Sequence, residues 1–84
     1  HACSEEVVEK IRNIVLENEK VLAIDDLKTR LFGSKMYVDI EIGLDSELTL
    51  IEAHKIAEEI HDSVEKEFVD CKHCMVHVNP KENS

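Results

Sequence analysis

Apolar and polar residues follow two different periods along this 84-residue chain, which predicts a mixture of helices and strands. Over residues 4–18 the apolar side chains recur at the spacing of one helical face, and Ser4 is placed to cap the helix. Residues 21–32 and 36–44 instead alternate between apolar and polar side chains, with a turn at residues 33–35 between them. This period of two predicts an antiparallel β-hairpin with one apolar and one polar face.

The second half of the chain predicts one more helix and one more strand. Thr49 and Glu52 have the spacing of a capping box at the start of the helix, and an apolar stripe continues from there to Phe68. A final strand is predicted over residues 71–78, and Pro80 is expected to end it. The order α-β-β-α-β predicts an α+β, ferredoxin-like fold, in which a three-stranded sheet carries both helices on one face. The polar face of the sheet is then open to a partner or a ligand.

Length and charge narrow the class of protein. Residues 1–84 are enough for a single small domain, whose marginal core favours pairing with a second copy. The net charge of −9, from 19 acidic and 10 basic residues, argues against nucleic-acid binding and favours cations as partners. No stretch is apolar for long enough to span a membrane, and the chain begins without methionine, so we expect a domain excised from a larger protein.

The chemistry that the sequence offers is that of metal ligands. No nucleophile elbow, phosphate loop or dinucleotide fingerprint is present, which predicts a binding domain and not an enzyme. Four of the five histidines and two of the three cysteines lie after residue 53. His54 and His61 share one face of the second predicted helix with Glu58 between them, a pattern that fits either metal ligands or an ordinary solvated face.

The last predicted strand carries a second group of candidate ligands. Strand alternation places Cys71, His73 and His77 on one face. The gap of two residues between Cys71 and Cys74 lets two thiolates reach one Zn²⁺ ion, if His73, His77 or a second chain completes the site. The same two cysteines equally fit small hydrophobic residues at the start of a strand.

Four segments resemble the cytoplasmic domain of the cation diffusion facilitator family. They are residues 21–33, 37–42, 48–57 and 76–80, and the pair Ala53-His54 and the closing Val76-His77-Val78-Asn79-Pro80 carry most of the specificity. The resemblance implies a metallochaperone-like α-β-β-α-β fold. It also implies a homodimer on the cytoplasmic side of a membrane antiporter that exports Zn²⁺ or a similar ion, with metal between the two domains closing the dimer.

Residue by residue, the resemblance implies a set of metal ligands. His54 and His77 match ligand positions of the family, while Asp25 and Glu41 stand where many members have histidine. Asn79 stands where well-known members have a bridging aspartate, which puts a two-metal bridge in doubt. The set Cys71, His73 and Cys74 is not a general family feature, and we predict it as an auxiliary site.

The sequence therefore predicts the regulatory domain of a zinc-type efflux transporter, which binds Zn²⁺ or another divalent transition metal and homodimerises. Its transport pathway would belong to a membrane portion outside this sequence. Two alternatives remain. One is a purely structural dimerisation domain, and the other is a soluble ferredoxin-like metallochaperone, which would be expected to carry its Cys-x-x-Cys in the first loop before a helix.

Overall fold

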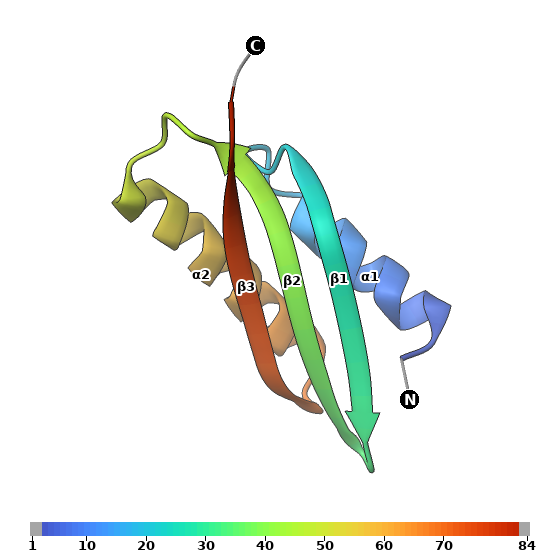
Figure 1. Ribbon diagram of the computed structural model, residues 1–84. Helices are drawn as coiled ribbons and strands as arrows, with labels where there is room; N and C mark the ends of the chain where they lie inside the picture. The colour runs from blue at the N-terminus through green and yellow to red at the C-terminus, as the bar shows by residue number, and fades with distance from the viewer. Residues whose placement is uncertain (1–2, 83–84) are drawn as a thin grey trace.

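The computed structural model describes residues 3–82 and contains the predicted elements in the predicted order. They are α1 (Glu5–Leu16), β1 (Ala23–Phe32), β2 (Lys35–Asp45), α2 (Leu50–Glu67) and β3 (Cys71–Lys81). The strands form one sheet in the order β1-β2-β3, with β1 antiparallel and β3 parallel to the central β2. Both helices lie behind the same face of this sheet (Figure 1). The predicted α+β fold is confirmed.

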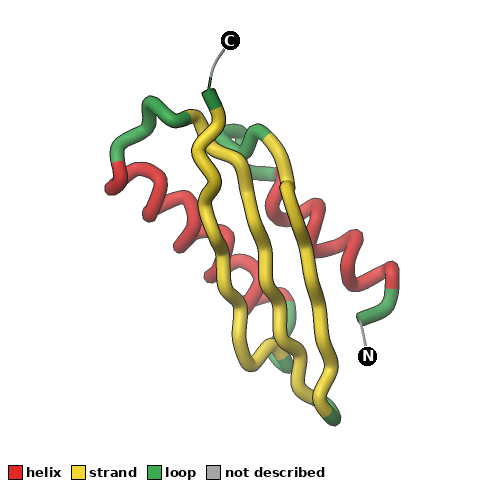
Figure 2. The backbone as a smooth tube through the Cα atoms, in the orientation of Figure 1, coloured by secondary structure: helices red, strands yellow, loops and turns green. Residues whose placement is uncertain are grey.

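The opposite face of the sheet is open. The tube in Figure 2 shows that no helix or loop among residues 3–82 crosses in front of the three strands. Neither α1 nor α2 is long and apolar enough to cross a membrane. The open face is therefore the surface on which a ligand or a second copy could be bound.

Both helices begin at the residues that the sequence predicted. The Ser4 hydroxyl accepts a hydrogen bond from the N–H of Val7 at 3.3 Å and caps α1. At the start of α2, the Thr49 hydroxyl accepts from the N–H of Glu52 at 3.1 Å, and the Glu52 carboxylate accepts from the N–H of Thr49 at 2.9 Å. This reciprocal capping satisfies donors that a helix start otherwise leaves without partners.

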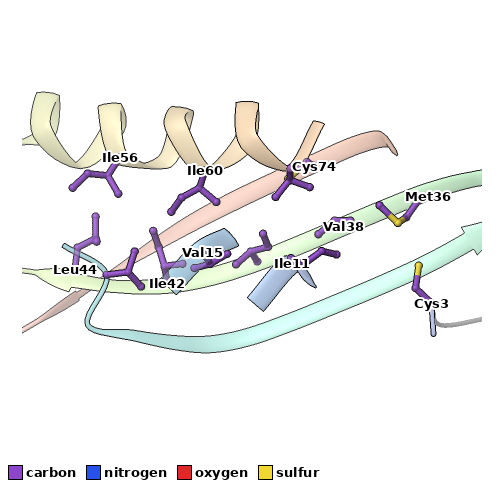
Figure 3. Packing of buried hydrophobic residues seen from close by; sticks show 13 residues of the cluster. Cys3, Ile11, Val15, Met36, Val38, Ile42, Leu44, Ile56, Ile60 and Cys74 are labelled. Atoms are coloured by element: carbon purple, nitrogen blue, oxygen red, sulfur yellow. The ribbon is translucent and has the colours of Figure 1, made fainter. Parts of the chain in front are cut away.

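The core lies between the central strand and the two helices. Alternate residues of β2 point towards the helices, and those at its centre are fully buried against the apolar stripes of α1 and α2 (Figure 3). The fully buried members include Val38, Ile40 and Ile42 of β2, Ile11 and Val15 of α1, and Val64 of α2. Each such side chain contributes roughly 1.5–3 kcal/mol of burial free energy. The helices are thereby held to one face, and the charged side chains of the strands point to the other.

The prediction that Pro80 ends the last strand is wrong, because β3 continues to Lys81. β3 lies at the edge of the sheet and pairs only with β2, so a residue without an N–H is tolerated there. The end of the strand is fixed by the carbonyl of Lys81, which accepts a hydrogen bond from the N–H of Ser46 at 2.9 Å. The side chains of Asn79 and Lys81 consequently belong to the sheet and not to a polar tail.

Candidate metal centre

A β-bulge in β1 brings an additional carboxylate to the open face. The pairing of β1 with β2 shifts between Ile24 and Asp26, so Asp25 is an extra residue without a partner on β2. Ile24 stays on the core side, and Asp26 lies opposite Glu41. Because a bulge redirects the side chain of its extra residue, the carboxylate of Asp25 also reaches the open face, where side chains of β3 contact it.

Asn79 connects the two carboxylates across the sheet. Its side-chain amide nitrogen donates hydrogen bonds to Asp25 Oδ2 at 2.9 Å and to Glu41 Oε1 at 3.1 Å. An amide NH₂ group has two N–H donors, so each carboxylate receives one of them. One residue of β3 thus holds together acidic residues from β1 and β2, although their charges repel one another.

Lys81 adds a positive charge to this group. Its Nζ lies 3.0 Å from Asp25 Oδ2, and the side chain of Asp25 is only 24% exposed. The hydrogen bond from Asn79 and then the contact with Lys81 hold the pKa of Asp25 below its ordinary value. We call Asp25, Glu41, Asn79 and Lys81 the Asn79 cluster. At neutral pH the Asp25 carboxylate is ionised, and Lys81 is its counter-ion.

His77 lies beside the cluster on the open face. It pairs in register with Glu41, while its neighbours Val76 and Val78 pack against the core. The prediction that His77 faces away from the helices is confirmed. An exposed imidazole thus lies next to Glu41 and two residues before Asn79 on the same strand face.

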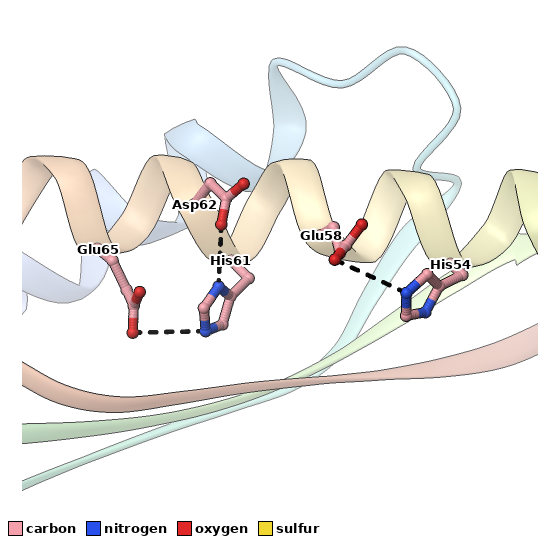
Figure 4. Close-up of polar contacts among 5 residues, drawn as sticks. All are labelled: His54, Glu58, His61, Asp62 and Glu65. Carbon is pink, nitrogen blue, oxygen red and sulfur yellow. Dashed lines mark hydrogen bonds and ion pairs between the residues drawn. The ribbon is translucent and has the colours of Figure 1, made fainter.

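The predicted ligand His54 lies in the other layer of the molecule. It is on α2, with a side chain that is 71% exposed, and its Nε2 is 3.8 Å from Glu58 Oε1. Further along the same helical face, His61 has Nδ1 3.2 Å from Asp62 and Nε2 3.4 Å from Glu65 (Figure 4). Two histidines of this face therefore have carboxylate partners on their own helix.

A single chain does not bring His54 and His77 together. α2 covers the face of the sheet that is opposite to His77 (Figure 1). Within residues 3–82, no group of three or more His, Cys, Asp or Glu side chains is arranged to hold a metal ion. A complete coordination sphere would therefore need rearrangement of these side chains or ligands from a second copy.

The prediction that Cys71 shares a strand face with His73 and His77 is wrong, because β3 also contains a bulge. The register shifts so that Met36 pairs with Cys71 while Tyr37 pairs with His73, leaving Lys72 as the extra residue. Cys71 therefore packs against the core, and its Sγ contacts the carbonyl of His73 at 3.3 Å. The ring of His73 lies on the other face, with its centroid 6.2 Å from that of Tyr37.

Two of the three cysteines are buried, and Cys71 is half-buried. Cys74 is 6% exposed and points into the core beneath α2 (Figure 3), where burial raises its pKa to about 12. Burial also raises the pKa of Cys71. Cys71, Cys74 and Cys3 are all free, and Cys3 is buried as well. Because the thiolate is the metal ligand, these positions favour packing over coordination in the arrangement seen here.

Sequence reasoning missed Lys81 and the connecting role of Asn79. The signal was present, since His77, Asn79 and Lys81 continue the strand alternation on one face. It was overlooked because a proline was expected to end the strand. The bulge at Asp25 is marked in the sequence only by two consecutive polar residues, Asp25 and Asp26, between the core residues Ile24 and Leu27.

Comparison with known proteins finds solved structures with the same fold and assigns this chain to a family. A manganese form of a MamM CTD variant matches with a TM-score of 0.83 and 25% identity, covering 92% of this chain and 98% of that one. A MamM CTD variant with an alanine substitution matches with a TM-score of 0.86 and 26% identity, covering 93% and 98%.

Among curated proteins, the manganese efflux system protein MneP of Bacillus subtilis (strain 168) is 31% identical over 75 residues, 89% of this chain and 25% of that protein. The cation-efflux pump FieF of Shewanella oneidensis is 32% identical over 76 residues, 90% of this chain and 25% of that protein. The chain thus spans about a quarter of the length of these relatives. The family model described as "Cation efflux protein, cytoplasmic domain" matches residues 3–81. The chain belongs to this family of cation efflux cytoplasmic domains.

Proposed function

We propose that this chain is the metal-responsive dimerisation domain of a divalent-cation efflux transporter, and that it acts by binding and not by catalysis. The observation that supports this most strongly is the Asn79 cluster. It holds two carboxylates against one amide on a sheet face that no helix covers, with His77 beside Glu41. The efflux proteins among its relatives support the link to transport.

The ligand atoms of the Asn79 cluster and of the adjacent His77 fit a divalent cation that accepts oxygen ligands. Asp25 and Glu41 offer carboxylate oxygens, Asn79 can offer its amide oxygen, and His77 offers one imidazole nitrogen. Carboxylate, carbonyl and water ligands suit Mn²⁺, whereas thiolate and imidazole sets suit Zn²⁺ better. The names of the relatives include manganese efflux system proteins. We therefore propose Mn²⁺ as the first ion to test, with the Zn²⁺ predicted from the sequence as the second.

The proposed partner is a second copy of the chain. A polar, open sheet face on a domain of net charge −9 would repel its own copy, and a cation between two such faces would remove that repulsion. A second copy could also supply ligands that one chain lacks, and His54 would enter the site only in this way. The cysteines are not part of the proposal, because both thiols of β3 face the core.

One observation favours a second candidate function. Asn79 and Lys81 already hold the acidic residues together without any metal, as a purely structural dimerisation domain would require. The two candidates differ in whether a divalent ion changes the association of the domain.

Sedimentation of the purified domain with chelator and with excess Mn²⁺ or Zn²⁺, together with calorimetric titration, separates them. We expect the metal to shift the domain towards dimer, and Glu41→Gln to weaken binding at least tenfold. Asp39→Asn is the matched control, because Asp39 is an exposed residue of the same strand, opposite Met75. Identical association with and without metal would overturn the metal-responsive function and leave the structural one.

A further inference from the structure

Lys81 reaches its partner by crossing the whole sheet. Asp25 lies on β1 and Lys81 on β3, at opposite edges, with β2 between them. The 3.0 Å contact between their charged groups therefore requires the lysine side chain to pass over β2. It does so at Gly43, where an added Cβ would lie 2.6 Å from Lys81 Cε and 2.9 Å from Lys81 Cγ.

This crossing depends on the absence of a side chain at position 43. Gly43 is buried, and the three atoms nearest to its hypothetical Cβ all belong to Lys81. The base of the lysine is fixed, since its carbonyl accepts the hydrogen bond from Ser46. We call the side chain of Lys81, as it lies over Gly43, the Lys81 strap.

The strap places a cation on the carboxylate that the proposed metal ion would use. An ammonium 3.0 Å from Asp25 Oδ2 and a metal ion on the same oxygen would repel each other strongly at that distance. The lysine side chain is 41% exposed and flexible beyond its backbone, so it can swing into water when another cation arrives.

We propose that the Lys81 strap is a built-in competing cation, which a divalent metal ion must displace from Asp25 in order to bind. The strap thereby lowers the metal affinity of the domain and sets the metal concentration at which it responds. This inference rests on the proposed function, because it concerns the same site. It differs from a merely structural ion pair, whose removal would change stability and leave metal affinity as it was.

Two substitutions remove the strap by different means. Lys81→Met removes the charge and keeps a chain of similar length. Gly43→Ala keeps the charge and obstructs its path, and its nearest contacts are with the flexible lysine side chain. The matched control is Lys28→Met, which changes the net charge equally and removes a lysine whose Nζ is 3.5 Å from Asp26.

Calorimetric titration with Mn²⁺ is the decisive measurement. We expect Lys81→Met and Gly43→Ala each to lower the dissociation constant by about threefold to tenfold, from the upper part of the range of a typical exposed ion pair to somewhat above it. Lys28→Met should change it by less than about twofold, because its exposed ion pair is with Asp26 and involves neither carboxylate of the Asn79 cluster. A second reading, independent of the measured affinity, comes from NMR with diamagnetic Zn²⁺: a nuclear Overhauser effect between Lys81 and Gly43 should be present without metal and disappear on titration.

These outcomes test the strap proposal and the proposed function separately. If wild type binds Mn²⁺ and both strap variants bind no more tightly than Lys28→Met, the strap proposal is overturned and the proposed function stands. An Overhauser effect that persists at saturating metal would likewise overturn the strap proposal alone. If no protein binds metal, Lys81→Met included, the proposed function fails and the inference fails with it.

Discussion

Replacing Asn79 with aspartate is expected to destabilise the metal-free domain. The amide nitrogen donates to Asp25 and Glu41, and an ionised aspartate has no donor with which to replace these hydrogen bonds. A hydrogen bond to a charged group contributes about 1.5–3 kcal/mol, and the low end applies to the half-buried Glu41. Loss of that bond alone should lower the melting temperature of a domain of this size by about 6–12 °C. Repulsion between the introduced carboxylate and those of Asp25 and Glu41 should lower the melting temperature further.

Calorimetric melting in chelator and then in excess Mn²⁺ tests this reasoning. We expect Asn79→Asp to gain more from Mn²⁺ than wild type does, because a cation can replace the lost donor between the carboxylates. Asn13→Asp is the control, since it adds the same charge at an exposed position in the last turn of α1 and should cost about 1 kcal/mol or less, through the helix dipole and the neighbouring Glu9 and Glu17. If Asn79→Asp melts at the wild-type temperature in chelator, Asn79 does not hold the two carboxylates together.

The remaining predictions concern the buried core and the start of α2. With a pKa of about 12, only about one in ten thousand Cys74 thiols is ionised at pH 8, so iodoacetamide should modify it only after unfolding, and rapid native labelling would contradict its burial. Thr49→Ala should cost about 1 kcal/mol in urea unfolding, and Thr49→Ser much less. Because hydrogen bonds with Thr49, first that from its backbone N–H and then that with its side chain, lower the pKa of Glu52, the stabilisation contributed by the Glu52 carboxylate should be present above about pH 4.5 and fade as the pH falls through the lowered pKa. Ile60→Ala should cost about 2–5 kcal/mol, whereas Ile51→Ala, at 81% exposed, should change stability by less than about 0.5 kcal/mol.

The elements of this fold could be predicted because each has a local cause. The capping box at Thr49 and Glu52 marks the start of α2 through hydrogen bonds between residues three apart. Alternation along β1 and β2 fixes which side chains meet the helices, and Gly33 takes the positive φ of 61° that the turn between them requires. Short-range patterns of this kind survive in the folded chain because the tertiary contacts agree with them.

The site could be predicted only in part, because its geometry depends on two register shifts. A bulge adds one residue to a strand and shifts the apolar alternation by one position, so the core residues on either side of it are three apart instead of two. The strand pairing, and not the alternation, shows that Asp25 and Lys72 are the extra residues. The first shift places the carboxylate of Asp25 on the open face, a position that strict alternation alone does not assign. The second turns Cys71 towards the core and separates it from His73. Both outcomes depend on pairing between strands that are distant in sequence.

Under the proposed function, the charge of the Asn79 cluster would limit how many cations it holds and would link metal binding to pairing. Asp25 and Glu41 carry two negative charges and Lys81 one positive charge, so the cluster has a net charge of −1 without metal. One divalent ion that displaces Lys81 neutralises both carboxylates, and a second ion would leave an uncompensated double charge, because Asn79 is neutral. Two metal-free copies facing each other through this surface would oppose like charges, whereas two loaded copies would not. We therefore expect the affinity between copies to rise with metal occupancy, and the metal-free association to strengthen as added salt screens the repulsion.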